Sequence, residues 1–366
     1  MSRKKKYEMR IGIIGCGVIA VGAHIPAYQK LGHALVALAD SVPGRAEKFA
    51  AQFGIASAYE DYHALLARGD IDAVSVCVPT FLHEQVAVDV LEAGKHLYLE
   101  KPPALDEPGI CHVVETARRM GKVLFVGSNS LYQPRFQIAR HMVREGKLGE
   151  VYAVRLNRAQ KRDIPNGWMK WKKYTRGFAI TEGVTHNLDQ TLFLLGDPEP
   201  ESVTCLTYNK FAGYPPLSFG YPMDAVESRV WDGVPKETED GVFALIRLKN
   251  GCGLLIDSFR ACNAEECYHL KLMGTAGGLK IDMRPAPGKK PLGLTYYHEP
   301  QRGVMAETEL DYPVGTMSHI DAIGHFMDCV ERGIPTNSNG SRAILIMRII
   351  DAMFASAEQN GRQVLL

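Results

Sequence analysis

The sequence predicts an α/β protein in two parts: a doubly wound parallel sheet, then a second domain whose sheet is mostly antiparallel. Three observations lead to this expectation. A glycine-rich turn follows a short apolar run near the N-terminus. From residue 10 to residue 128, apolar strand-like runs alternate with helix-like segments, as in sheets with crossover helices. Later strand-like runs have few helix-like segments between them, which favours antiparallel pairing.

The composition is that of an ordinary globular chain and argues against several classes of protein. Of the 366 residues, 46% are hydrophobic and 23% are charged, enough for two domains with a sizeable core. A net charge of +1 gives no reason to expect nucleic acid or an acidic membrane as a partner. No apolar run has membrane-spanning length. The eight cysteines form no C-x-x-C pair, which favours free thiols in the cytoplasm.

The glycine-rich turn has the spacing G-x-G-x-x-A, which is typical of a site for the pyrophosphate of a dinucleotide. Gly15 permits the tight turn, Gly17 lets the pyrophosphate approach the backbone, and Ala20 is small enough for close helix–strand packing. The following helix offers N–H groups and a positive dipole end to phosphate. We therefore expect cofactor contacts from Gly15, Cys16, Gly17, Val18, Ile19 and Ala20.

Asp40 ends the next apolar run, residues 34–39, where the second strand of such a sheet places a carboxylate on the adenosine ribose. Because a carboxylate repels a 2′-phosphate, the sequence favours NAD over NADP. Ser41 and Arg45 are nearby, so use of both remains open. Arg45 is expected either to cover the adenine or to be solvated on the next helix.

Polar residues follow the next strand-like runs at their carboxyl ends, where ligands bind in open parallel sheets. Pro79 and Thr80 follow the run 72–78, and Thr80 can cap the next helix or face the nicotinamide ribose. His83 lies in the first turn of that helix, as a structural hydrogen-bonding residue or a cofactor contact.

A charged pair, Glu100 and Lys101, ends the run 95–99 and is followed by two prolines that fix the backbone. Its place at a strand's carboxyl end favours ligand binding over a surface salt bridge. Asn129 follows the fifth run, 123–127, at the same edge of the sheet.

In the second part, Glu182 and His186 fall on one face if their segment is helical, with Asp189 one turn further along. An acid beside an imidazole orients it and raises its basicity, as a general base for an alcohol proton requires. An ordinary capping or salt-bridge pair is the alternative. One histidine with two carboxylates could also bind a metal, but no other ligand cluster accompanies them, and we predict no metal site.

The rest of the second part supplies strands, a loop and two helices. Tyr214 to Pro235 is rich in proline, glycine and aromatic residues and is expected to be a long loop. Helical spacing predicts packing helices over 318–331 and 342–359. The expected strands are 151–157, 203–209, 241–248, 253–259 and 269–273.

In this order, the motifs resemble the Gfo/Idh/MocA family, the group of glucose–fructose oxidoreductase and inositol dehydrogenase. The most specific part of the resemblance is Glu100–Lys101–Pro102. The segment 127–151 and the ending 326–364 extend the resemblance over nearly the whole chain. Its other motifs are Gly15-x-Gly17-x-x-Ala20, Asp40 and Pro79–Thr80–x–x–His83.

The resemblance implies a Rossmann dinucleotide-binding domain over residues 1–128. It also implies a substrate-binding and oligomerisation α/β domain over 129–366, with a large open, mostly antiparallel sheet. Such sheets often join subunits, so a homodimer or homotetramer is expected. The family's D-x-x-x-H pattern, with histidine as acid/base, matches Glu182 and His186.

This chain departs from the family pattern in the same region. Glutamate replaces the usual aspartate at position 182, and Arg176–Gly177–Phe178 replaces the usual glycine run. Ser130–Leu131 stand where many members carry arginines. These departures make it unsafe to assign a substrate by analogy with any one member.

Together these expectations describe an NAD(P)-dependent oxidoreductase that interconverts a secondary alcohol and a ketone on a sugar or cyclitol. Lys101 and His186 are expected at the reacting oxygen. Trp168 either belongs to a sugar-stacking lid or anchors a solvated basic loop. The alternatives are a glycosidase that uses NAD for transient oxidation and a non-catalytic NAD-binding regulator. Predicted substrate contacts are Asn157, Trp168 and Asp189.

Overall fold

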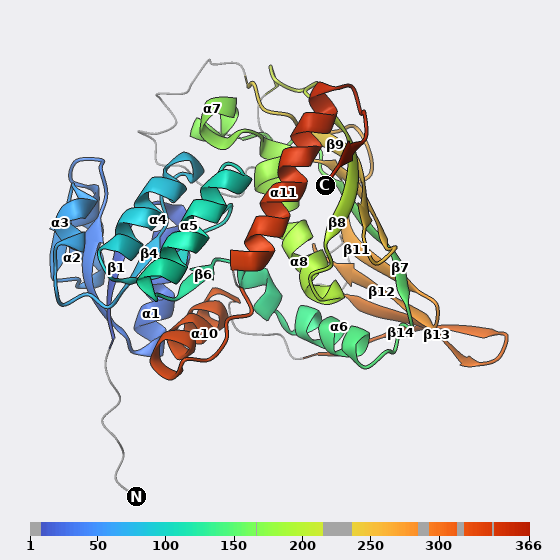
Figure 1. The fold of residues 1–366 in the computed structure, drawn as a ribbon, viewed down its shortest axis with the longest axis horizontal. Coiled ribbons are helices and arrows are strands. Elements are labelled where there is room, and N and C mark those ends of the chain that lie inside the picture. The colour runs from blue at the N-terminus through green and yellow to red at the C-terminus, as the bar shows by residue number, and fades with distance from the viewer. Residues whose placement is uncertain (1–8, 166, 215–235, 285–292, 313–317, 339) are drawn as a thin grey trace, which may run out of the picture. The chain divides into compact units, whose positions relative to one another are not determined.

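The computed structural model describes residues 9–165, 167–214, 236–284, 293–312, 318–338 and 340–366. They form two compact units (Figure 1). The first unit comprises Met1–Tyr132 and Thr316–Ile344, and the second comprises Gln133–Gly315 and Leu345–Leu366. The expected division at residue 128 stays a prediction. In the structure, a segment close to the C-terminus returns to the first unit.

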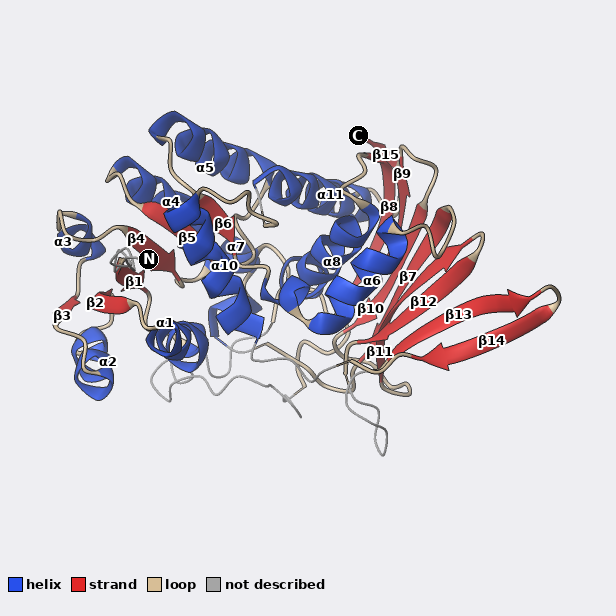
Figure 2. Cartoon of the chain, turned by 90° about the horizontal axis from the view of Figure 1, so that it is seen from below, coloured by secondary structure: helices blue, strands red, loops and turns tan. Residues whose placement is uncertain are grey.

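The first unit contains a six-stranded sheet in the order β3-β2-β1-β4-β5-β6, and every neighbouring pair is parallel. Helices α4 and α5 lie on one face of this sheet and α1 on the other (Figure 2). The strands are β1 Arg10–Ile14, β2 Ala34–Ala39, β3 Ser57–Tyr59, β4 Ala73–Val76, β5 His96–Leu99 and β6 Leu124–Val126. The helices are α1 Ile25–Leu31, α2 Arg45–Phe53, α3 Tyr62–Leu66, α4 His83–Glu92, α5 Glu107–Met120 and α10 Ser318–Arg332.

The strands of this sheet form as expected because apolar side chains on both of their faces are buried by helices. The structure adds β3, which the sequence analysis did not predict; it has three residues, none fully buried. The helix expected after the glycine-rich turn starts as a π-helix, Ala20–His24, and continues as α1 with Pro26 in its first turn.

The second unit contains a nine-stranded sheet in the order β14-β13-β12-β11-β7-β10-β9-β8-β15. Its neighbours pair antiparallel except β7 and β10, which are parallel. The strands are β7 Val151–Ala159, β8 Pro200–Tyr208, β9 Gly241–Leu248, β10 Gly253–Phe259, β11 Cys267–Gly274, β12 Gly277–Asp282, β13 Leu294–Gln301, β14 Val304–Glu309 and β15 Val364–Leu365.

Helices α6 and α8 lie on one face of the nine-stranded sheet (Figure 2). We call this the helix face and the opposite one the outer face. Strand β9 shows the consequence, since Val242, Ala244 and Ile246 are buried while the alternate side chains are exposed. The helices in or entering this unit are α6 Pro134–Arg144, α7 Lys172–Thr175, α8 Thr185–Leu195 and α11 Gly340–Glu358.

The predicted fold class, a parallel Rossmann sheet followed by a large, mostly antiparallel sheet, is confirmed. The five expected strands of the second sheet and both C-terminal helices form, while β12–β15 were not predicted. The expected loop at Tyr214–Pro235 lies almost wholly outside the described residues. No described helix combines the length and apolar character needed to cross a membrane.

Candidate active site

The glycine-rich turn has the geometry that a pyrophosphate requires. Gly15 has φ +90°, and a Cβ there would lie 2.6 Å from the Cys77 carbonyl oxygen, so only glycine fits. A Cβ at Gly17 would meet no atom within 4 Å, which leaves its backbone open to a ligand. Ala20 is fully buried. The turn therefore fits the role expected of it in binding NAD.

Asp40 is joined to this turn. Its carboxylate accepts hydrogen bonds from Cys16 N at 2.8 Å and from Val42 N at 2.9 Å. Arg45, the first residue of helix α2, has its Nη1 atom 3.6 Å from the same carboxylate and forms an ion pair with Asp40. Each carboxylate oxygen retains a lone pair that can accept a ribose hydroxyl. The pair therefore fits the ribose end of NAD.

Glu100 is buried at the end of β5, and Lys101 follows it. One carboxylate oxygen bonds His24 Nε2 at 2.9 Å, and the other accepts from Lys101 N at 3.1 Å. Burial by itself raises the pKa of Glu100, but the hydrogen bond and charge of His24 lower that pKa to about 2. A Cβ at Gly127, which follows β6, would lie 2.9 Å from the carboxylate, so this position also confines it. Glu100 thus anchors the backbone that carries Lys101.

The side chains of His83 and Thr80 are buried after strand β4. The ring nitrogens of His83 lie 2.6 Å from the Pro102 carbonyl oxygen and 2.8 Å from that of Val78. The imidazole therefore links the segment after Lys101 to the segment after β4. A cofactor contact by either residue stays a prediction.

Asn129 lies just beyond β6, and its side chain forms hydrogen bonds with residues of the first unit. Its amide nitrogen lies 3.3 Å from Ser318 Oγ and 2.9 Å from His319 Nε2, at the start of α10. Burial lowers the pKa of His319 and Glu100 opposes that effect. The chain thus returns near its C-terminus to orient a residue at the ligand edge of the first sheet.

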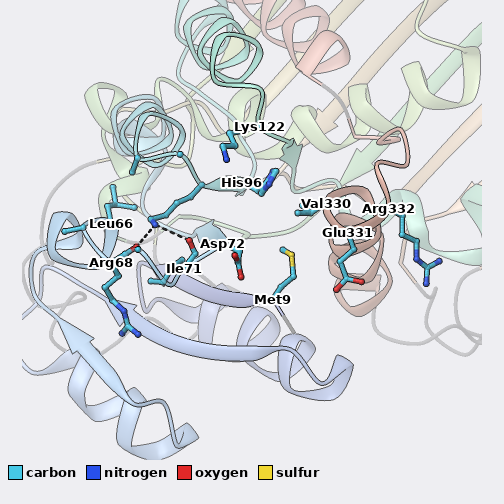
Figure 3. A pocket seen from close by; sticks show the side chains of 15 residues that line it. Met9, Leu66, Arg68, Ile71, Asp72, His96, Lys122, Val330, Glu331 and Arg332 are labelled. Atoms are coloured by element: carbon cyan, nitrogen blue, oxygen red, sulfur yellow. Dashed lines mark hydrogen bonds between the residues drawn. The ribbon is translucent and has the colours of Figure 1, made fainter. Parts of the chain in front are cut away.

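A pocket of about 990 Å³ in the first unit is a different site (Figure 3). It is lined by Met9, Asp72 and His96, which stand before or at the first residues of β1, β4 and β5. Gly15 and Glu100 lie beyond the opposite, carboxyl ends of these strands. The pocket is therefore at the wrong edge of the sheet for the dinucleotide. Lys95 Nζ bonds the carbonyl oxygens of Arg68 and Ile71 beside it.

In the second unit, Glu182 lies in a π-helical segment, Phe178–Val184, which runs directly into α8 with His186 in its first turn. Its carboxylate accepts a hydrogen bond from Thr175 Oγ1 at 3.2 Å. The start of this segment is fixed by Glu239, which accepts from Ile180 N at 2.8 Å. The predicted helix forms, but the turn that carries Glu182 is wider than an α-helical one.

The predicted substrate contacts have different surroundings. Asp189 is buried on α8 and Trp168 belongs to a short 3₁₀ segment, Gly167–Lys170. Asn157 lies on the outer face of the sheet, where it donates to Asp257 Oδ2 at 2.7 Å. Residues alternate between the faces of a strand, so its neighbour Arg158 points to the helix face instead. The structure does not bring Asn157 together with Glu182.

Two arginines that the sequence analysis missed lie on the helix face beside Gly183. A Cβ at Gly183 would lie 3.5 Å from Arg260 Nη1 and 3.6 Å from Arg158 Nη1. Arg158 follows the buried Val154 and Leu156 on alternate positions of β7. The sequence could have indicated Arg158, because this charged residue occupies the next position in the alternating series of buried apolar residues on β7. No group of three or more described His, Cys, Asp or Glu residues could hold a metal ion.

Comparison with known proteins places the chain in a family. Residues 9–128 match the family described as "Oxidoreductase family, NAD-binding Rossmann fold", and residues 136–280 match the GFO/IDH/MocA C-terminal domain. The chain belongs to the Gfo/Idh/MocA family. It is an oxidoreductase with an NAD-binding Rossmann domain, as the motifs predicted.

Individual relatives match over the whole chain. D-glucoside 3-dehydrogenase of Escherichia coli (strain K12) is 31% identical over 359 residues, 97% of each chain. Inositol 2-dehydrogenase of Rhizobium meliloti (strain 1021) is 25% identical over 97% of this chain and 98% of its own. The structure of levoglucosan dehydrogenase with NADH has a TM-score of 0.82 at 20% identity and 98% coverage of both chains, which shows the shared fold.

Proposed function

We propose that this enzyme interconverts a secondary alcohol and a ketone on a sugar, sugar derivative or cyclitol by hydride transfer with NAD. The observation that carries the proposal is the 31% identity to a D-glucoside 3-dehydrogenase, which extends over both units. The inositol 2-dehydrogenase supports the same substrate class, because inositol and a glucoside both offer secondary hydroxyls on a six-membered ring.

In the proposed mechanism, His186 accepts the hydroxyl proton as the carbon loses a hydride, and a ketone results. NAD supplies the hydride acceptor when it is bound. Lys101 donates a hydrogen bond to the same oxygen and stabilises its developing negative charge. Glu182 orients His186 or holds a neighbouring hydroxyl. The buried contacts of Glu100 support the role of Lys101, because they fix its backbone.

The test is a screen of sugars and cyclitols, with NADH formation as the readout and NADP run in parallel. Lys101→Ala and His186→Ala are each expected to lower kcat about 100-fold or more. Lys249→Ala, at an exposed lysine in the turn between β9 and β10, is the matched control. Full turnover by both active-site variants would contradict the mechanism.

The comparisons do not favour the two alternatives. A glycosidase with transient oxidation would release an aglycone with no net NADH, so product analysis separates it from a dehydrogenase. A regulator would bind NAD and turn over no substrate.

We also propose that the enzyme assembles as a homodimer or homotetramer through the outer face of its nine-stranded sheet. Leu206, Phe243, Leu245 and Leu255 are 40–56% exposed on neighbouring strands of that face. An apolar patch of this kind marks a protein contact. Leu245→Glu is expected to produce monomers in light scattering, whereas Ile334→Glu, at an exposed residue after α10, leaves the assembly intact. A monomeric parent would contradict the proposal.

The cytoplasm is the compartment that we propose for this enzyme. All eight cysteines are free thiols, and five of them are buried. Thiols stay reduced in the cytoplasm. An alkylation assay on protein from lysed cells, with and without reductant, is expected to label the same number of cysteines.

A further inference from the structure

The parallel strands β7 and β10 of the second sheet end side by side, unlike the antiparallel pairs around them. Because β7 and β10 run in the same direction, their carboxyl ends meet at one edge, with Ser258 paired to Arg158. Arg158 and Ser258 both lie on the helix face. Arg260 follows β10 at the same edge. The π-helical segment with Glu182 and Gly183 packs against this end of the strands, so both Nη1 atoms converge on Gly183.

Both guanidinium groups are held rigidly. Arg158 Nε donates to Gln160 Oε1 at 2.6 Å, and its guanidinium lies 4.7 Å from the centre of the Tyr268 ring. Arg260 Nε donates to Asp163 Oδ2 at 2.7 Å, and its guanidinium lies 4.0 Å from the centre of the Phe178 ring. The hydrogen bond at Nε and the stacking on an aromatic ring fix the plane of each guanidinium group, and so fix the direction of its Nη1 atom.

The two guanidinium groups share one carboxylate. Asp163 Oδ2 serves both arginines, because Arg158 Nη2 also lies 3.4 Å from it. The next acidic side chains along this edge have other partners: Glu239 binds Ile180 N, and Asp240 pairs with Lys236 at 3.5 Å. Only 8% of the Arg158 side chain and 11% of the Arg260 side chain are exposed. A buried guanidinium without an anion of its own destabilises the fold, and a bound anion relieves this cost.

Polar atoms without a hydrogen-bond partner among the described residues also occur in these strand ends and in the π-helical segment. Within the described residues, the hydrogen bonds of both arginines involve Nε and Arg158 Nη2, and the two Nη1 groups make none. Gln160 Nε2, Thr181 Oγ1 and Ser258 Oγ are buried without a partner in the described part of the chain. These three residues are at most 2% exposed and belong to the same strand ends and π-helical segment. Buried polar atoms normally have partners, and these three could bond to a polar ligand.

We propose that Arg158 and Arg260 form a subsite for an oxyanion of the substrate, so that the enzyme acts on an acidic sugar: a uronate or a sugar phosphate. The proposal rests on the proposed function, because Gly183 directly follows Glu182. Guanidinium forks match carboxylate and phosphate oxygens. Gly183 has no side chain to cover the two Nη1 groups. A hydroxyl-only sugar leaves the excess positive charge uncompensated.

The test measures binding by titration calorimetry on the full-length enzyme with NAD, so that it does not depend on turnover. The probes are D-glucuronate, D-glucose 6-phosphate and D-glucose, which separate the carboxylate, the phosphate and the neutral ring. At least one anionic probe is expected to bind at least tenfold more tightly than D-glucose, and added salt weakens this preference. Equal binding of all three would overturn the proposal.

Two variants locate the effect. Arg260→Gln removes one fork, and Gly183→Ala places a methyl group at ordinary contact distance from both Nη1 atoms without a clash. Both are expected to reduce the anionic preference at least tenfold, while Arg302→Gln, at an exposed arginine between β13 and β14, retains it. An unchanged preference in both variants would overturn the assignment to this place. Anion-selective binding with no NADH from any sugar would instead refute the proposed function.

Discussion

His24 holds the predicted catalytic segment of the first unit through one hydrogen bond, and its replacement tests that connection. The imidazole is fully buried, and its Nε2 binds the Glu100 carboxylate, whose other oxygen receives Lys101 N–H. A glutamine at this position can place its amide nitrogen near the site of Nε2, whereas asparagine is one methylene too short. His24→Asn and His24→Gln therefore form a matched pair that differs in reach.

The magnitude follows from the pKa of Glu100. That pKa lies at about 2, against 4.5 for the unperturbed group, and the difference is equivalent to about 3 kcal/mol of stability. This contribution is complete above pH 4.5 and is lost as the pH falls from 4.5 towards 2. In His24→Asn, the remaining effects of Lys101 and His319 no longer outweigh burial, which raises the pKa of Glu100. We expect a loss of about 3–5 kcal/mol near neutral pH.

The assay is thermal and urea unfolding at pH 5 and pH 8, together with steady-state kinetics. For a unit of this size, the loss lowers Tm by about 6–20 °C. Because Glu100 in the variant binds a proton on folding, the deficit of His24→Asn grows as the pH rises. Its kcat is expected to fall about tenfold with a smaller change in the KM of NAD, and His24→Gln recovers at least half of both losses. Equal stability of the two variants at both pH values would refute this reasoning.

Two further changes test the cofactor end of the first unit. Gly15→Ala forces a Cβ to within 2.6 Å of the Cys77 carbonyl oxygen at φ +90°, so we expect a loss of more than about 3 kcal/mol in stability by urea unfolding; a variant as stable as the parent would contradict the turn geometry. Asp40→Ala removes the acceptor for Cys16 N and the charge that repels a 2′-phosphate. We expect the KM of NAD to rise about tenfold and the preference for NAD over NADP to narrow. An unchanged cofactor preference would show that Asp40 does not select the ribose.

The cofactor end could be predicted from sequence because its requirements are local. Gly15, Gly17 and Asp40 follow strand ends within a short stretch of chain, and each residue type is set by backbone space or charge. The long-range partners could not be predicted. His319 reaches Asn129 from 190 residues away, and His24 reaches Glu100 from 76 residues away. Neither contact leaves a spacing in the sequence, because the fold alone brings these residues together.

The second unit shows the limit of strand periodicity. The run 151–157 identified β7. The alternation of side chains along a strand does not by itself say which of the two faces packs against the helices. Asn157, a predicted substrate contact, lies on the outer face, while its neighbour Arg158 lies on the helix face. The substrate contact of Asn157 stays a prediction. Strands β13 and β14 were missed because most of their side chains are exposed or half-buried, which removes the apolar alternation.

Glu239 is expected to make the stability of the second unit depend on pH in the opposite sense from Glu100. Burial raises the pKa of Glu239, although its hydrogen bond from Ile180 N opposes the shift. A raised carboxyl pKa contributes stability below the ordinary glutamate value, and this contribution is lost as the pH rises through the raised value. Glu239→Gln keeps an oxygen that can accept from Ile180 N and removes the titration.

We therefore expect Glu239→Gln to match or exceed the parent's stability at pH 8 and to gain less than the parent on acidification to pH 5. Glu239→Leu removes the acceptor at the start of the segment that carries Glu182, and we expect it to lose about 1–3 kcal/mol at both pH values. Urea unfolding of the three proteins measures both effects. If the glutamine and leucine variants behave alike, the Ile180 hydrogen bond does not hold this segment. If the glutamine variant follows the parent's pH dependence, another group titrates in its place.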